Sequence, residues 1–239
     1  MKYLVLRLSG PLMSFGEGDY WDIRSTGIFP TKSAITGLLA ACFGWSRNDT
    51  EEIRELSEGI SVSVRQDNRF SLLRDYHTIL NTLKADGKPN ENAVQSYRSY
   101  LMEAEFSVLV SAKSGALYVS IRSALMDPVW PIFLGRKSCA PSVPVYWGEE
   151  IEAENSHAAF QSLPVTGTLL NQKVPNWFTN EKKSQKKSGK PVQHACITDE
   201  KLSGVDTRKS LTRDNIVNSR LRVFSQREVY KFFIQGIES

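Results

Sequence analysis

The sequence is poor in the residues that build disulfide frameworks and metal sites. It holds three cysteines and three histidines in 239 residues, and no CxxC pair. The cysteines, Cys42, Cys139 and Cys196, are odd in number and far apart, so we expect reduced thiols and no disulfide framework. His194 and Cys196 form the one close His/Cys pair, whereas a structural zinc site needs four ligands. We therefore predict no metal.

A long hydrophobic run is also missing. No stretch of about 18 apolar residues occurs, which argues against a membrane-spanning helix. The first eight residues have a short apolar core that Arg7 interrupts, and no small-residue cleavage site follows. This pattern predicts a β-strand and not a signal peptide, and we expect a cytoplasmic protein.

Motifs for nucleotide binding and catalysis are absent as well. The sequence contains no GxxxxGK[ST], no GxGxxG and no GxSxG, so we predict no cofactor. None of the histidines has the sequence setting of a catalytic triad. His77, next to Tyr76 and near Arg74, leaves an alternative open in which it acts as acid or base in RNA cleavage. A histidine that lies on the surface or contacts RNA is the simpler interpretation.

What the sequence does contain is ordinary globular composition with a mild positive charge. Hydrophobic residues make up 41% and charged residues 23% of the chain. The 30 basic and 26 acidic residues give a net charge of +4. A chain of this length forms one large domain or two small ones. The excess positive charge permits nucleic-acid binding without requiring it.

The first 65 residues predict the order strand, loop, helix, helix, strand. The strands are expected at Tyr3–Leu8 and Ile60–Arg65, and the helices from Thr31 to about Gly44 and from Asn48, as N-cap, to Gly59. The loop between the first strand and the first helix, Leu12–Pro30, is rich in glycine and aromatic residues. Loops of this length in compact domains are usually functional.

The rest of the chain is less regular. Residues 72–105 are polar and turn-rich, which predicts an arm that extends from the core. Further strands are expected at Phe106–Ser111 and Ala116–Ile121, joined as a hairpin, and at Leu221–Phe224 and Val229–Ile234. We place a domain boundary near residue 140 and expect a mobile lysine-rich loop at residues 181–190.

Three clusters combine basic and aromatic or small residues. Single-stranded nucleic acid favours this pattern, because bases stack on aromatic rings and phosphates pair with cations. The long loop holds one cluster, which includes Arg24; the arm holds the second; Gly135–Ser138, with Arg136 and Lys137, forms the third. The helix start at Thr31–Ser33 also suits a phosphate, although plain N-capping explains these residues equally well.

These clusters, in this order, resemble one known protein family. Arg24–Ala41 matches its R-x-T-x-x-x-P-[ST]-x-S-x-x-x-G-L-L block, and Leu8–Pro11 followed by Phe15–Gly16 matches its N-terminal signature. Leu73–Thr78 and Phe133–Cys139 complete the set. On these motifs the chain resembles the CasD or "Cas-five" family, the RAMP-type subunit of type I-E CRISPR Cascade complexes. The resemblance weakens beyond about residue 147, and the glycine-rich C-terminal loop frequent in RAMP proteins is missing.

The resemblance implies a fold and a function. The fold would be α+β, with a ferredoxin-like, RRM-related domain at residues 1–140, an extended β-hairpin thumb at about 72–105 and a small C-terminal β-rich part at 141–239. The protein would be a non-catalytic subunit that binds the 5′ handle of crRNA. It would cap the filament of backbone subunits, contact the large PAM-reading subunit and meet target DNA through the complex. The residues expected to contact the RNA are Arg24, Thr26, Thr31, Lys32, Ser33, Arg74, Tyr76, His77, Tyr97, Arg98, Arg136, Lys137 and Ser138.

Two other functions stay open beside this scaffold role. One is a metal-independent endoribonuclease that processes precursor crRNA, as in the related type I-C subunit, with Tyr76, His77 and a Lys or Arg as the acting groups. The other is a free-standing single-strand RNA-binding protein, which the exposed arm disfavours because such arms usually need a neighbour to bury them. The motif context favours the scaffold.

Overall fold

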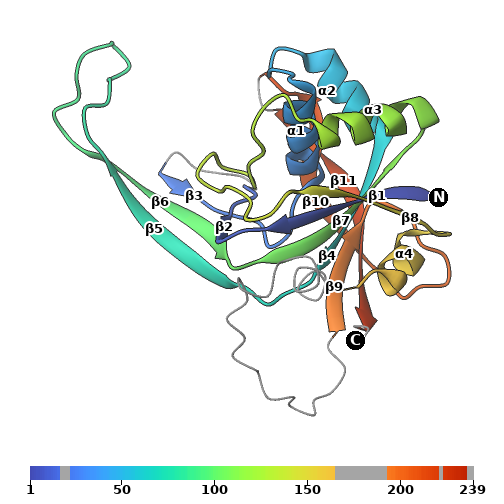
Figure 1. Ribbon diagram of the computed structural model, residues 1–239. Helices are drawn as coiled ribbons and strands as arrows, with labels where there is room; N and C mark the ends of the chain where they lie inside the picture. The colour runs from blue at the N-terminus through green and yellow to red at the C-terminus, as the bar shows by residue number, and fades with distance from the viewer. Residues whose placement is uncertain (17–21, 165–192, 221–222, 236–239) are drawn as a thin grey trace, which may run out of the picture.

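The computed structural model describes residues 1–16, 22–164, 193–220 and 223–235. The lysine-rich stretch 181–190 lies outside the described residues, as do Tyr20 and Trp21, two aromatic residues of the long loop Leu12–Pro30. Two sheets and four helices make up the described part (Figure 1). The strands are β1 (Lys2–Ser9), β2 (Leu12–Met13), β3 (Ile23–Arg24), β4 (Ile60–Gln66), β5 (Ser71–Ile79), β6 (Val94–Met102), β7 (Glu105–Ala112), β8 (Tyr146–Glu152), β9 (Gln193–Thr198), β10 (Arg208–Asn218) and β11 (Val223–Gln235). The helices are α1 (Lys32–Phe43), α2 (Thr50–Gly59), α3 (Gly115–Met126) and α4 (Ser156–Ser162).

The larger sheet contains the strand order of a ferredoxin-like fold. Four of its seven strands run in the order β4-β7-β1-β8, and neighbours pair in the antiparallel sense. Helices α1 and α2 connect β1 to β4, and α3 connects β7 to β8, so the chain follows a βαββαβ pattern with α2 as an extra helix. These three helices lie on one face of the sheet (Figure 1). The arrangement confirms the predicted fold class.

Strand β1 lies inside the sheet and contributes to the core on both sides. Leu4, Leu6 and Leu8 pack in the cluster beneath the helices, whereas Tyr3 and Val5 pack in the cluster next to α4. Side chains alternate along a strand, so a strand covered on both faces needs a continuous apolar run. We call the two sides of the sheet the helix side and the α4 side.

Helix α1 begins and ends close to where the sequence predicts. Thr31 caps its start by accepting a hydrogen bond from the backbone N–H of Ala34 at 3.2 Å. Gly44 ends it in the left-handed region, with φ of 77°, and a Cβ there would lie 2.8 Å from Cγ1 of Val129. Glycine meets both requirements, because it has no side chain and adopts positive φ at little cost.

Residues after 140 extend the same sheet. Strand β8 pairs with β1 at one edge, and β9 pairs with β4 on the other side. Beyond β9 follow β11 and then β10, which forms the outer edge. The boundary expected near residue 140 therefore lies in the connection between α3 and β8, inside one continuous sheet.

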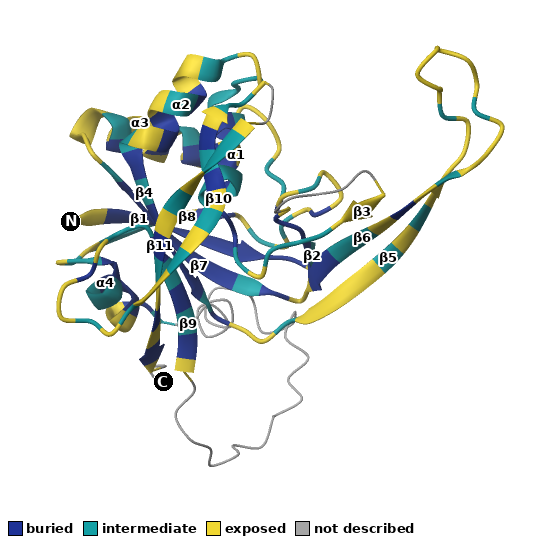
Figure 2. Cartoon of the chain, turned by 180° about the vertical axis from the view of Figure 1, so that it is seen from behind, coloured by how far each residue is buried: buried dark blue, intermediate teal, exposed yellow. Residues whose placement is uncertain are grey.

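The arm expected at residues 72–105 is a β-hairpin. Strands β5 and β6 pair from Ser71 opposite Met102 to Ile79 opposite Val94. We call β5, β6 and the connecting residues 80–93 the thumb. At its base the short strands β2 and β3 pair with the other edge of β6. Figure 2 shows that β5 is exposed over most of its length, whereas the central strands of the large sheet are buried.

One expected strand is a helix. Ala116–Ile121, predicted as the second strand of a hairpin, lies within α3. Ser114 caps this helix by accepting a backbone hydrogen bond at 3.2 Å. Tyr118, Ile121 and Leu125 then bury one face at helical spacing. The prediction was wrong because the apolar run Ala116–Ile121 is short, and because Ser114, which caps the helix, lies in a segment that also suits a hairpin turn.

Several boundaries also differ from the expectation. Helix α2 begins at Thr50 and not directly after Asn48, because the Asp49 carboxylate turns back to accept the N–H of Ser46 at 2.5 Å. The loop expected to be irregular contains β2 and β3. Within the described residues, the expected C-terminal strands belong to one strand, β11, and the sequence does not predict its partner β10.

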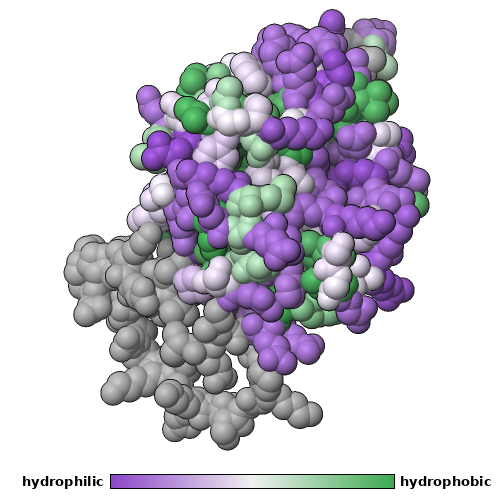
Figure 3. Space-filling model, turned by 90° about the vertical axis from the view of Figure 1, so that its right-hand side faces the viewer, coloured by the Kyte–Doolittle hydropathy of each residue, from purple (hydrophilic) through white to green (hydrophobic). Residues whose placement is uncertain are grey.

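Neither a membrane-spanning helix nor a cluster of metal-ligating side chains occurs among the described residues. None of the described helices is long and apolar enough to span a membrane. Within the same residues no group of three or more His, Cys, Asp and Glu side chains is placed to hold a metal ion. Figure 3 shows the side that faces right in Figure 1, where hydrophilic residues dominate and hydrophobic ones form small separate patches.

Candidate nucleic-acid interface

The thumb presents its predicted RNA contacts on two opposite faces. Tyr76 lies opposite Tyr97 in the β5–β6 ladder, and Asp75 lies opposite Arg98. Successive side chains of a strand point to opposite sides of the sheet. We call the face with Arg74, Tyr76 and Tyr97 the tyrosine face, and the face with Asp75, His77 and Arg98 the histidine face.

The tyrosine face is an exposed aromatic surface. The guanidinium of Arg74 lies 4.1 Å from the ring centre of Tyr97, and the rings of Tyr76 and Tyr97 are 5.2 Å apart. The two tyrosines remain 47% and 41% exposed. Arg74 therefore stacks on the protein's own ring, and the face offers aromatic area to a partner.

The histidine face brings two arginines together. Strand β3 pairs with β6 in parallel and sets Arg24 beside Arg98. Asp75 lies opposite Arg98, but its carboxylate contacts His77 Nε2 at 2.6 Å. In the described part of the chain, neither arginine has a carboxylate partner, and Nε of Arg98 is buried without a hydrogen bond. Like charges on neighbouring strands repel, so this pair favours an anion.

Arg136 holds the base of the thumb together. Its Nη1 donates to the carbonyl of Ser99 on β6 at 3.3 Å, and its Nη2 donates to the carbonyl of Arg24 on β3 at 3.1 Å. The guanidinium also lies 4.7 Å from the ring centre of Tyr100. Arg136 is predicted as an RNA contact, but its donors bridge β6 and β3. We assign it to positioning Arg24.

The turn that carries Arg136 passes close to the start of the thumb sheet. Gly135 has a φ of 96°, and a Cβ at this position would lie 1.8 Å from the carbonyl oxygen of Ser14. Lys137 and Ser138 are exposed on the same turn. Lys137 pairs with no described residue, and its turn is held to β6 and β3 by the hydrogen bonds of Arg136.

The predicted phosphate site at Thr31–Ser33 is used internally. The Lys32 ammonium donates to the carbonyl of Ile60 at 2.8 Å and pairs with Asp199 at 3.0 Å, and its side chain is 12% exposed. The backbone N–H of Lys32 donates to the Asp214 carboxylate at 2.7 Å. A protein carboxylate thus occupies the position at which a helix N-terminus would bind phosphate. Lys32 therefore has internal partners for its charge, and its direct contact with RNA stays a prediction.

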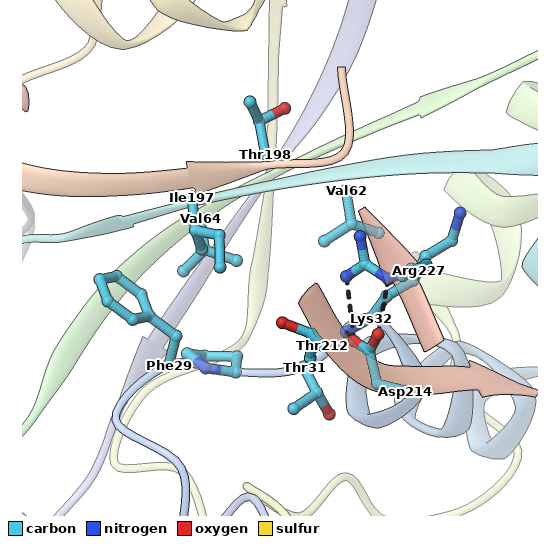
Figure 4. A pocket seen from close by; sticks show the side chains of 11 residues that line it. Phe29, Thr31, Lys32, Val62, Val64, Ile197, Thr198, Thr212, Asp214 and Arg227 are labelled. Atoms are coloured by element: carbon cyan, nitrogen blue, oxygen red, sulfur yellow. Dashed lines mark hydrogen bonds and ion pairs between the residues drawn. The ribbon is translucent and has the colours of Figure 1, made fainter. Parts of the chain in front are cut away.

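A small pocket lies beside this helix start (Figure 4). Its volume of about 30 Å³ leaves room for water and is small beside a typical ligand-binding pocket. Arg227 closes one side by donating to Asp214 at 2.6 and 2.9 Å. Phe29, Val64 and Ile197 line the apolar side. The pocket therefore belongs to the packing of α1 against the sheet.

The predicted hydroxyl contacts also have internal partners. Thr26 Oγ1 accepts the N–H of Phe15 at 2.9 Å, which holds the long loop on itself. Thr31 caps α1, and its hydroxyl lies 3.1 Å from that of Ser33. These groups fix the loop that presents Arg24, and their direct contact with RNA stays a prediction.

Replacing Lys32 with methionine is expected to destabilise the fold. Removing one partner of a buried ion pair leaves the other charge uncompensated, and we expect a loss of about 3 kcal/mol in the free energy of unfolding. Denaturant unfolding measures this loss. RNA affinity of the folded variant should equal that of the wild type. A variant of unchanged stability that binds RNA more weakly would restore Lys32 as a direct contact.

Sequence reasoning missed a buried ionic network on the α4 side of the sheet. Arg65 on β4 is 1% exposed, and its Nε lies 2.5 Å from Asp67. Arg7 on β1 donates to Ser107, which in turn donates to Asp67. Burial lowers the pKa of Arg7, while the nearby carboxylates of Glu149 and Asp67 oppose that shift. One sequence signal could have indicated this network: Arg7 and Arg65 each interrupt the apolar pattern of a strand, β1 and β4, at a position that points inward.

The sequence comparison decides the family. The profile of the CRISPR-associated protein (Cas_Cas5) family matches residues 3–220. The chain belongs to this family. It is also 34% identical over 182 residues to the CRISPR system Cascade subunit CasD of Escherichia coli (strain K12), a match that covers 72% of this chain and 81% of that protein. The resemblance seen in the motifs is thereby confirmed.

Solved structures share the fold of this Cas5-family chain. A chain of a CRISPR RNA-guided surveillance complex matches with a TM-score of 0.73 at 20% identity, over 98% of this chain and 90% of that one. A crystal structure of a Cas protein matches with a TM-score of 0.65 at 25% identity, over 98% and 95%. The first match supports the fold alone, because its sequence identity is low.

Proposed function

We propose that this Cas5-family chain is a non-catalytic subunit of a type I-E Cascade surveillance complex that binds the 5′ handle of crRNA. The observation that carries the proposal is the adjacency of Arg24 and Arg98 on the histidine face. Two neighbouring guanidinium groups without a counter-ion suit a nucleic-acid backbone, because each can donate two hydrogen bonds to one phosphate. Lys137 adds a third cation on the turn that Arg136 holds to β6 and β3.

The two thumb faces take different partners in this proposal. One RNA segment cannot contact both faces at the same point, since the sheet separates them. The histidine face brings two arginines side by side, whereas Arg74 on the tyrosine face stacks on Tyr97, so we assign the handle to the histidine face, with His77 as a contact. The tyrosine face is then left for a protein neighbour.

The thumb supports a place inside an assembly. Leu72, Leu80 and Leu83 are 65%, 68% and 72% exposed along it. Exposed apolar side chains of this kind mark surfaces that a partner covers. We propose that the adjacent backbone subunit covers the thumb, that the chain caps the filament and contacts the large subunit, and that target DNA is met through the complex. The relative named as a Cascade subunit supports this placement.

Loss of the arginine pair tests the proposed function. The double variant Arg24→Ala, Arg98→Ala should bind the repeat-derived 5′ segment of the guide RNA about 10- to 100-fold more weakly, equivalent to about 1.4–2.8 kcal/mol. The salt dependence of log Kd should flatten by about 1.4, which corresponds to two lost phosphate contacts on a single strand. Fluorescence anisotropy across a salt series measures both quantities.

A matched control removes the same charge elsewhere. Arg54 on α2 and Arg122 on α3 are exposed and pair with glutamates. The variant Arg54→Ala, Arg122→Ala should keep the affinity and the salt slope of the wild type within about twofold. Equal losses in the two double variants would mean that net charge, and not the histidine face, determines binding.

A further inference from the structure

The β10–β11 ribbon carries two opposed positive charges on the helix side. Arg208 on β10 lies directly opposite Lys231 on β11. Both are exposed, and neither pairs with any residue in the described part of the chain. Arg227 lies four residues before Lys231 on β11, on the same face, and forms an ion pair with Asp214. The charges of Arg208 and Lys231 therefore have no counter-charge among the described residues, and like charges directly opposite each other destabilise a sheet.

The opposite face of the same ribbon is charge-balanced. Lys209 lies 2.5 Å from Glu228, and the hydroxyl of Tyr230 donates to the same carboxylate at 3.3 Å. The hydrogen bond from Lys209 lowers the pKa of Glu228, as a compensated pair requires. The excess charge is thus a property of one face and not of the ribbon as a whole.

An exposed aromatic ring lies beside the uncompensated pair. Phe233 follows Lys231 by two residues on β11, so both side chains point to the helix side. It is 65% exposed, and the residue opposite it on β9 is the small Ala195. A phenylalanine at this position gains little from folding, because its ring stays in water. We call Arg208, Lys231 and Phe233 the ribbon strip.

The ribbon strip is connected through β9 to the loop that carries Arg24. Lys231 is the cross-strand partner of Ile197 on β9. Ile197 lines the small pocket together with Phe29, which belongs to the long loop (Figure 4). Residues of the long loop, β9 and β11 thus follow one another on the helix side of the sheet.

We propose that the ribbon strip is a second contact site for single-stranded RNA. Arg208 and Lys231 would each neutralise one phosphate, and a base would stack on Phe233. Cations next to an open aromatic ring fit a nucleotide, which brings a phosphate and a flat ring together, better than an acidic protein surface, which brings charge alone. The inference rests on the proposed function, since it extends the path of the same RNA.

Variants on the two faces of the ribbon test the proposal on the full-length chain. The probe is a fluorescent single-stranded RNA with the repeat-derived 5′ segment of the guide. Arg208→Ala, Lys231→Ala should flatten the salt dependence of log Kd by about 1.4. Phe233→Ala should weaken binding at least about fivefold, the lower limit for a lost base stack. Lys209→Ala, on the balanced face, should bind as the wild type does.

The outcomes separate this proposal from the proposed function. If the wild type binds the RNA and the Arg24, Arg98 variant does not, but all ribbon variants bind as the wild type does, the ribbon strip is refuted and the histidine face stands. Ribbon variants that bind RNA normally but no longer co-purify with the other complex subunits would show a protein interface and also refute it. If the wild type does not bind the RNA at all, the proposed function itself fails.

Discussion

Replacing Arg65 with leucine is expected to lower the free energy of unfolding by about 3–5 kcal/mol, the usual effect of removing one partner from a buried ion pair. All five N–H donors of this guanidinium have acceptors. Nε donates to Asp67, Nη1 to the carbonyls of Phe160 and Leu163, and Nη2 to Pro164 and Ser107. Leucine would leave Asp67 buried without its main partner and the carbonyls at the end of α4 unsatisfied.

Urea unfolding of the wild type and the variant measures this loss. The double variant Arg65→Leu, Asp67→Leu should be more stable than the single variant, because the uncompensated carboxylate is gone as well. A matched surface change, Arg54→Ala, should cost less than about 1 kcal/mol, since exposed ion pairs contribute little. An Arg65 variant within 1 kcal/mol of the wild type would show that the network is not needed for stability.

Replacing Gly135 with alanine is expected to cost about 3 kcal/mol, the upper end of local backbone strain. The Cβ would lie 1.8 Å from the carbonyl oxygen of Ser14, which is backbone and cannot rotate away. The turn would have to move, although the N–H of Ser14 is bonded to the carbonyl of Leu134 at 3.1 Å. Arg136 moves with the turn, so RNA binding through Arg24 should weaken too.

Gly204 provides the control for this prediction. It also has positive φ, 75°, but a Cβ there meets no atom within 4 Å. Gly204→Ala should cost only about 1–2 kcal/mol, the price of the left-handed conformation itself. Thermal unfolding of the two variants separates the cost of positive φ, which both share, from the cost of the contact between Cβ and Ser14, which only Gly135→Ala makes. Equal losses would mean that the close approach of Ser14 to the turn has no energetic consequence.

The parts of the fold that follow local rules are predictable from the sequence. Helix α1 has a threonine cap and a glycine stop, and both signals lie within a few residues of the helix they define. Helix α3 is not predictable in the same way. Its apolar run is short, and the cap residue Ser114 follows Lys113 and precedes Gly115 in a segment that also suits a hairpin turn.

The candidate site shows the same limit. Arg24 and Arg98 can each be selected as basic residues near aromatic ones, but their adjacency depends on a two-residue strand pairing with the thumb. The internal partners of Lys32 are not predictable either, because Asp199 and Asp214 reach it from distant segments of the chain. No local pattern around Lys32 shows that two carboxylates will arrive there.

The most direct test of the central claim is to incubate the purified chain with labelled repeat RNA in EDTA, with the 5′ handle present or removed. We expect the RNA to stay intact and to bind, and removal of the handle to abolish most of the binding. A discrete cut that the variant His77→Ala abolishes would contradict this account and make the protein a metal-independent processing endoribonuclease. Binding that ignores the handle would contradict it as well.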